Sequence, residues 1–227
     1  MGFILYLDSF LIPSSLFLTF GYHAYLWQSS RQKPSSTKFG VDKLRRKAWF
    51  GDIKQGDDKK GMLAVQSLRN TLMTTILTAS IAILVNLSLV ALTNNTYNAS
   101  RLFNSEVFGS HSARIYPLKY GSASLFLLVS FLCSSMALGY LIDANFLINA
   151  SYDECSSSPA YTQTIFERGF ALAVIGNRVL CISFPLLLWM FGPLPVAVSS
   201  AALVWALYEL DFAVAGKFKC NPNVQTL

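Results

Sequence analysis

Arginine and asparagine side chains stand next to each other at two places where the sequence turns apolar. Arg69 and Asn70 precede one apolar run, and Asn177 and Arg178 precede another. An arginine at the edge of hydrocarbon is costly unless its side chain reaches water or pairs with a carboxylate. Asp143, at the end of a third apolar run, is the carboxylate that we expect to pair with Arg69 or Arg178.

Other polar side chains are expected at the same level and complete a candidate site. Successive residues of a helix are turned by about 100°, which places Gln66, Arg69 and Asn70 on one face. The predicted polar network comprises His23, Gln66, Arg69, Asn70, Asp143, Asn145, Asn177 and Arg178. Two interpretations stay open: a binding site, or arginines that reach solvent beside asparagines that cap helix ends.

Asp8 is a separate candidate, because it lies inside the first apolar run of the chain. A carboxylate within a membrane span is a functional candidate by default. Asp8 is about two turns from the start of the run, where water can reach it. Lys119, at the head of another apolar run, is a possible partner.

The residues that usually carry enzymatic or metal chemistry are sparse. The chain has two histidines and four cysteines, with no CxxC pair and no zinc-ligand spacing. It also lacks a phosphate-binding loop, a zinc-protease HExxH and a serine nucleophile elbow. We therefore predict no catalytic residues, no metal, no cofactor and no enzymatic activity.

The composition indicates the elements that must position these side chains. Hydrophobic residues make up 53% of the 227 residues and charged residues 13%, well below the roughly 25% charged residues of soluble domains. About 20 apolar residues in a helix cross a hydrocarbon core of about 30 Å. We predict an all-α, single-domain integral membrane four-helix bundle with spans at residues 3–27, 71–92, 118–142 and 179–208.

The fourth predicted span is irregular. It contains 191-FGPLPVAV-198, and each proline removes a backbone donor, so the helix should kink or break near Gly192. If the two halves instead form a re-entrant hairpin, the C-terminus becomes cytoplasmic.

Charge predicts the orientation in the membrane. Residues 28–70 hold eleven Lys or Arg against four Asp, a balance of +7 in a chain whose total is +6. One basic loop between apolar spans is typical of a cytoplasmic loop and argues against nucleic-acid binding. The prediction continues with an outer loop at 93–117, an inner loop at 143–178 and an outer tail at 209–227.

This orientation has consequences for location and modification. Both termini become extracytoplasmic, in a plasma membrane or an endomembrane. The outer loop holds two glycosylation sequons, which begin at Asn94 and Asn98 and agree weakly with that side.

The basic loop contains a helix-like piece, 41-VDKLRRKAWFGDIK-54. One interpretation is an interfacial helix that binds anionic lipid headgroups, with Trp49 at headgroup level. The lipid-surface residues would be Lys43, Arg45, Arg46, Lys47 and Trp49. The other interpretation is a solvated basic helix that only sets the topology.

Three ordered motifs carry a family resemblance: 57-DDKKGMLAVQSLRN-70, 141-LIDANFLIN-149 and 176-GNRVLCISFPLLLWMFGP-193. With Tyr22-His23 and 207-LYELDF-212, the chain resembles the plant and bacterial multi-pass membrane proteins grouped as domain of unknown function 599. The resemblance extends to about Phe212. It implies a four-span membrane protein, of plant type, and it supplies no activity.

Two functions remain after these exclusions. The first is a non-enzymatic scaffold or subunit of a membrane assembly, with protein partners or a second copy of the chain. The second is a small transporter or channel, in which the broken fourth helix and the polar edge residues line a path. A transporter should enclose a hydrated cavity, whereas a scaffold should be packed between its helices and expose a surface for partners.

Overall fold

The computed structural model describes residues 2–53, 58–94, 115–149 and 159–213, and within these residues it contains helices and no strands. The all-α class predicted from composition is therefore confirmed. In chain order the elements are α1 (Gly2–Gln32), the short 3-10 helix η1 (Pro34–Ser36), α2 (Lys38–Ile53), α3 (Asp58–Asn94), α5 (Ile115–Asn149), α6 (Pro159–Leu188), the 3-10 helix η3 (Trp189–Phe191) and α7 (Pro193–Phe212).

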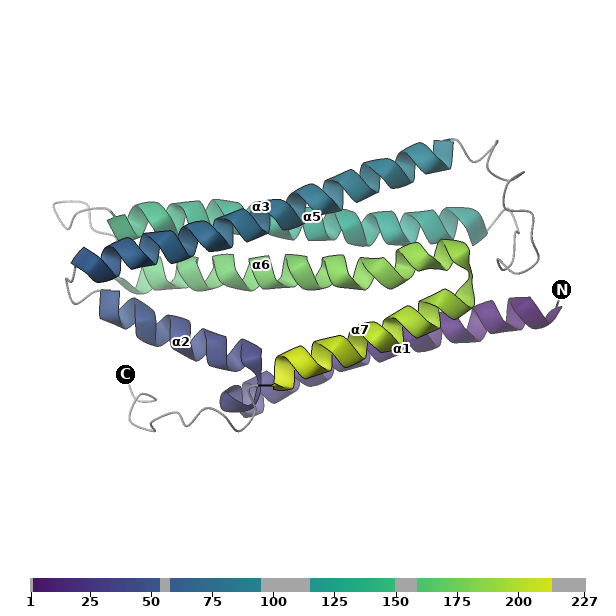
Figure 1. The fold of residues 1–227 in the computed structure, drawn as a ribbon, viewed down its shortest axis with the longest axis horizontal. Helices are drawn as coiled ribbons and strands as arrows, with labels where there is room; N and C mark the ends of the chain where they lie inside the picture. Colours follow the sequence, from purple (N-terminus) through teal and green to yellow (C-terminus); the bar gives the residue numbers. More distant parts are fainter. Residues whose placement is uncertain (1, 54–57, 95–114, 150–158, 214–227) are drawn as a thin grey trace.

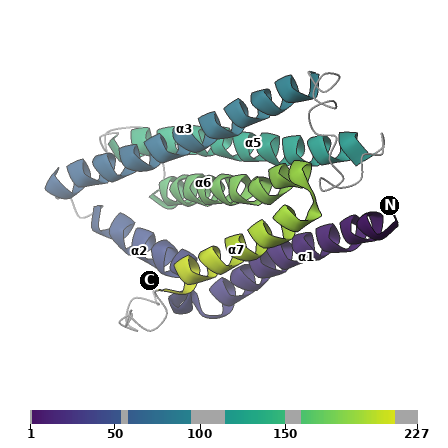
Figure 2. The same ribbon diagram turned by 45° about the vertical axis from the view of Figure 1, so that its right-hand side comes forward.

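The long helices form two groups that lie along one another. Helix α5 packs between α3 and α6, while α1 packs along α7 (Figure 1). The pair α1 and α7 contacts the group α3, α5 and α6 mainly where α7 follows α6. Figure 2 shows the same two groups from another side. Helix α2 lies at the end of the bundle where α3 and α6 begin, and we call this the α2 end.

Four helices of the described chain are long and apolar enough to cross a membrane: Val65–Thr93, Leu118–Ile148, Ala160–Phe191 and Pro193–Phe212. The predicted spans 71–92 and 118–142 lie inside the first two. The predicted span 179–208 is divided between the last two, and the predicted span 3–27 lies in α1, which is not among these four.

The predicted break near Gly192 is confirmed, and it is a full reversal of the chain. Gly192 has a φ of 128°, a left-handed conformation that a residue with a Cβ rarely adopts. Pro193 then begins α7, at a position where its missing N–H removes no helical hydrogen bond. The helix before the break is longer than expected because α6 already begins at Pro159.

This reversal bears on two predictions. Most of the predicted inner loop 143–178 is helix, since α5 runs to Asn149 and α6 starts at Pro159. The start of α1 and the end of α7 lie far apart along the bundle (Figure 1), and the placement of both termini on the extracytoplasmic side stays a prediction. The sequons and most of the outer loop 93–117 and of the tail 209–227 lie outside the described side chains.

Two apolar clusters hold the helices together. One lies toward the end opposite α2 and joins α1, α3, α5, α6, η3 and α7 through Ile12, Leu89, Ala123, Leu127, Leu186, Trp189 and Val196. The other lies at the α2 end, where α3, α5 and α6 bury Leu68, Leu141, Ala144, Ile165 and Phe166. Trp49 of α2 packs against this second cluster, so α2 belongs to the fold.

Small residues bring α5 and α6 into close contact. Ser130 is fully buried, and its hydroxyl donates to the Gly176 carbonyl at 2.7 Å. A Cβ on Gly176 would lie 2.5 Å from Ser134 Oγ. Ser130 and Ser134, whose four-residue spacing suits close helix packing, therefore form such a contact. The similar pair Ser135 and Gly139 does not, because a Cβ on Gly139 would meet nothing within 4 Å.

Candidate functional site

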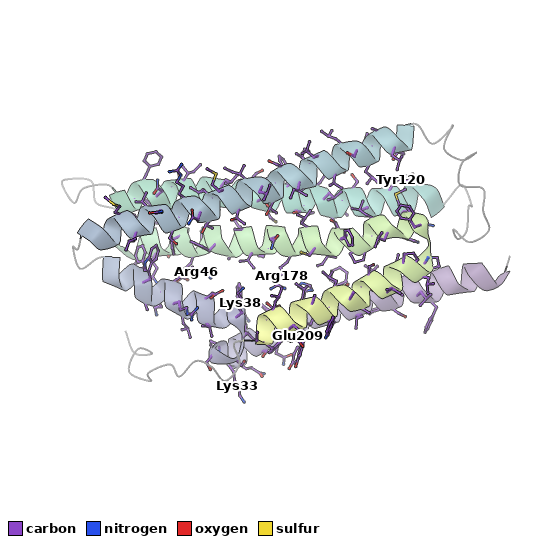
Figure 3. The ribbon with its side chains drawn as sticks, in the orientation of Figure 1. Lys33, Lys38, Arg46, Tyr120, Arg178 and Glu209 are labelled. Atoms are coloured by element: carbon purple, nitrogen blue, oxygen red, sulfur yellow. The ribbon has the colours of Figure 1, made fainter. Side chains whose placement is uncertain are left out.

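A buried carboxylate joins three helices near the end of α7. Asp211 is 1% exposed, and its Oδ1 accepts a hydrogen bond from Arg178 Nη2 of α6 at 2.5 Å. Its Oδ2 accepts a hydrogen bond from the Tyr22 hydroxyl of α1 at 2.6 Å. We call these three residues the Asp211 cluster. Figure 3 shows Arg178 between α6 and α7.

The side chains of the Asp211 cluster stabilise one another. Both carboxylate oxygens take a donor, and the arginine neutralises the carboxylate. Removing one member of a buried ion pair leaves the other charge uncompensated and costs about 3–5 kcal/mol. The cluster therefore holds α1, α6 and α7 in one arrangement.

Two buried nitrogen atoms, one in the cluster and one on the residue after Tyr22, have no hydrogen-bond partner among the described residues. They are Arg178 Nη1 and His23 Nε2. His23 Nδ1 lies 2.7 Å from the Thr19 carbonyl, which can only accept, so Nδ1 carries a proton. In the neutral ring Nε2 is then an acceptor. The His23 and Tyr22 rings meet edge to face, with their centroids 5.4 Å apart.

The predicted pairing of Arg178 with Asp143 is wrong, because Arg178 pairs with Asp211. Asp143 is exposed, and among the described residues it forms no ion pair. The reason is rotational: Ala144 and Leu141 face the α2-end core, and one step of about 100° turns Asp143 off that face.

The remaining members of the predicted polar network are distributed over the surface. Asn177 is exposed, and Asn145 and His23 are half-buried. Gln66, Arg69 and Asn70 are exposed on α3, where with Met62, Val65 and Met73 they line an open hollow of about 830 Å³. Their predicted common face is confirmed, but that face points outward. The structure thus brings Arg178 and His23 near Tyr22 and leaves the α3 residues apart.

Asp8 lies in the first part of α1, and its side chain is outside the described ones. Lys119, the partner considered for it, is buried at 4% exposure. Its Nζ lies 5.8 Å from the centroid of the Trp189 ring. That distance fits a cation over an aromatic face.

A second polar site lies between α2, α3 and α6. It is a hollow of about 320 Å³ lined by Asp42, Arg45, Arg46, Trp49, Ser67, Phe166 and Phe170, and we call it the α2 hollow. The guanidinium carbon of Arg46 lies 4.8 Å from the centroid of the Phe170 ring. Arg45 lies 3.8 Å from a carboxylate oxygen of Asp42. Figure 3 shows Arg46 at the junction of α2 and α6.

Local chemistry sets the position of α2. Thr37 caps the helix, since its hydroxyl accepts a hydrogen bond from the Gly40 amide at 3.2 Å. Gly40 is required for the turn, because a Cβ there would overlap the Pro34 carbonyl. At the other end Phe50 is buried, and its ring centroid lies 5.8 Å from that of Phe166.

Of the predicted lipid-surface residues, Lys43, Arg45 and Lys47 are exposed. Trp49 is half-buried, and its ring centroid lies 5.7 Å from that of Phe166, so it contacts α6. Arg46 is also partly covered, and this burial lowers its pKa, while the charges of Asp42 and Glu167 act to raise it.

Sequence reasoning missed three contributors to these sites. Asp211 belongs to the predicted outer tail, on the opposite side of the membrane from Arg178, although 207-LYELDF-212 is part of the family resemblance. Tyr22 has no sequence signal beyond its place next to His23. Phe166 lies in the predicted inner loop, where its helical spacing with Phe170 is the one available signal.

The fold and its apolar surface define an all-α integral membrane protein with paired charges among its helices. The chain belongs to the family described as "Protein of unknown function, DUF599", which matches residues 10–215. No curated protein and no solved structure matches the chain. The recognition from three sequence motifs is therefore confirmed, while plant origin stays an expectation.

Proposed function

We propose that this protein is a non-enzymatic membrane scaffold, or a subunit of a larger membrane assembly. The observation that carries the proposal is the Asp211 cluster, in which the carboxylate has a donor on each oxygen. Polar groups that neutralise one another are suited to holding helices together. The close packing of α5 on α6 at Ser130 and Gly176 supports the same interpretation.

The proposal includes an orientation in which the α2 end faces the cytoplasm. Residues 28–70 carry the positive charge of the chain, and basic segments stay on the cytoplasmic side. If α1 crosses together with α3, α5, α6 and α7, the chain starts outside and ends inside. The exposed charges of α2 then face partners or anionic lipid in the cytoplasm.

A small transporter or channel is the competing function, and one observation favours it. Arg178 Nη1 and His23 Nε2 are buried without a described partner, and one donor and one acceptor that lack partners suit water or a small polar solute. A transporter would need these two atoms to lie on a continuous path.

Two measurements separate the functions. Full-length protein in sealed liposomes should pass sodium, potassium, chloride and phosphate tracers no faster than protein-free liposomes. Native mass spectrometry of protein extracted from its source membrane should give an assembly of fixed stoichiometry. Tracer flux that Arg178→Gln abolishes would overturn the scaffold in favour of transport, and a monomer without partners would also contradict it.

A further inference from the structure

The α2 hollow is a depression that is open to the surface and lined by polar and aromatic side chains. Its walls come from three helices, with Arg45 and Arg46 on α2, Ser67 on α3 and Phe170 on α6. Its volume of about 320 Å³ lies at the lower end of the range for small-molecule sites. Two guanidinium groups and a hydroxyl provide several hydrogen-bond donors next to aromatic rings.

Arg46 is able to bind an anion, because the described residues place no carboxylate in contact with its guanidinium group. It stacks on Phe170, and among the described residues no carboxylate oxygen lies within 4.0 Å of it. Stacking covers the flat face of a guanidinium and leaves its edge donors available for two oxygens. Asp42 approaches Arg45 at 3.8 Å, a loose contact that an incoming anion can replace.

Helix lengths place the hollow at the membrane boundary. Helix α3 has 37 residues and α6 has 30, which correspond to about 55 Å and about 45 Å, against a hydrocarbon core of about 30 Å. Counting about 20 residues back from Leu188 reaches Gly169, next to Phe170. With the hydrocarbon core counted from Leu188, the proposed orientation puts the hollow at the level of the lipid headgroups.

We propose that the α2 hollow binds the phosphate of an anionic phospholipid, with Arg45 and Arg46 donating to its oxygens and Phe170 and Trp49 contacting its apolar part. This inference rests on the proposed orientation and names the partner of the α2 face. Free phosphate shares the oxygen chemistry, but it has no apolar part for the two rings and no reason to be concentrated at headgroup level.

The test is lipid retention by the full-length protein. Protein in phosphatidylcholine nanodiscs is titrated with phosphatidic acid, and bound lipid is counted by native mass spectrometry. Arg46→Gln should weaken binding roughly tenfold, the loss expected for one charge-assisted contact. Lys38→Gln is the matched control, since it removes one charge from an exposed position of the same helix outside the predicted lipid-surface residues and should change binding less than about twofold.

Three outcomes would overturn the proposal. The first is an equal loss in Arg46→Gln and Lys38→Gln, which would indicate a general effect of surface charge. The second is unchanged binding in Arg46→Gln. The third is displacement of the lipid by inorganic phosphate. If Arg46→Gln does not fold, Arg46→Lys and Arg45→Gln take its place, and each should weaken binding. The amount of bound lipid depends neither on tracer flux nor on assembly. A failure of this proposal is therefore distinguishable from a failure of the scaffold proposal.

Discussion

The Tyr22 hydroxyl donates a hydrogen bond to the Asp211 carboxylate at 2.6 Å, although 189 positions separate the two residues. The contact joins α1 to the end of α7, and Arg178 extends it to α6. A polar contact of this kind specifies which helices lie together, whereas lipid-like apolar surfaces can pack in many ways.

Asp211→Asn should destabilise the protein by about 3–5 kcal/mol, because it leaves the Arg178 charge buried without a carboxylate. Thermal unfolding of the detergent-solubilised protein measures the effect. Glu209→Gln is the control, since Glu209 is exposed two residues earlier on α7 and its loss should change little. Equal melting temperatures for the two variants would show that the cluster does not support the bundle.

Gly176→Ala should separate α5 from α6, because its new Cβ would lie 2.5 Å from Ser134 Oγ. Overpacking of this kind costs about 1–3 kcal/mol. Gly139→Ala should instead stabilise the protein. Nothing lies within 4 Å of the added Cβ, and alanine favours a helix by about 1 kcal/mol over glycine. Unfolding in a denaturant titration checks both, and a stabilising Gly176→Ala would contradict the close contact.

Phe166→Ala should release α2 from α6. Phe166 is 1% exposed, and its ring packs on Trp49 and Phe50, so truncation should cost about 3–5 kcal/mol. Limited trypsin digestion should then cut α2 at its basic residues faster than in the wild type. Phe146→Ala, at an exposed position of α5, is expected to leave the rate unchanged. Resistance of α2 in the Phe166 variant would mean that other contacts hold it.

Cys220 should react with a membrane-impermeant maleimide from the cytoplasmic side. It follows α7, which ends beside the start of α2 (Figure 1), and α2 belongs to the basic segment that the proposed orientation puts on the cytoplasmic side. A variant that keeps only Cys155, in the predicted inner loop between α5 and α6, provides the reference for the proposed cytoplasmic side. Labelling of Cys220 from the opposite side would contradict the proposed orientation and favour the four-span topology predicted from hydropathy.

Several features of this fold can be read from local sequence. The helix-breaking residues around Gly192 predicted where a helix ends, and the four-residue spacing of Ser130 and Ser134 is typical of a close approach between helices, which α5 makes to α6. Both follow from short-range rules, since proline and glycine act on their own backbone and small residues expose it. The Asp211 cluster does not follow from such rules.

The sequence by itself determined that the protein is helical, apolar enough for a membrane and a member of its family. Only the tertiary structure decided that Asp211, and not Asp143, neutralises Arg178. The physical reason is the number of long helices. Residues 159–178 mix polar and apolar side chains, so hydropathy passes over a helical segment that the packing of Phe166 and Gly169 on α5 makes stable. Adding that segment to α6 gives two long helices, α6 and α7, in place of one predicted span and brings the end of α7 back to Arg178.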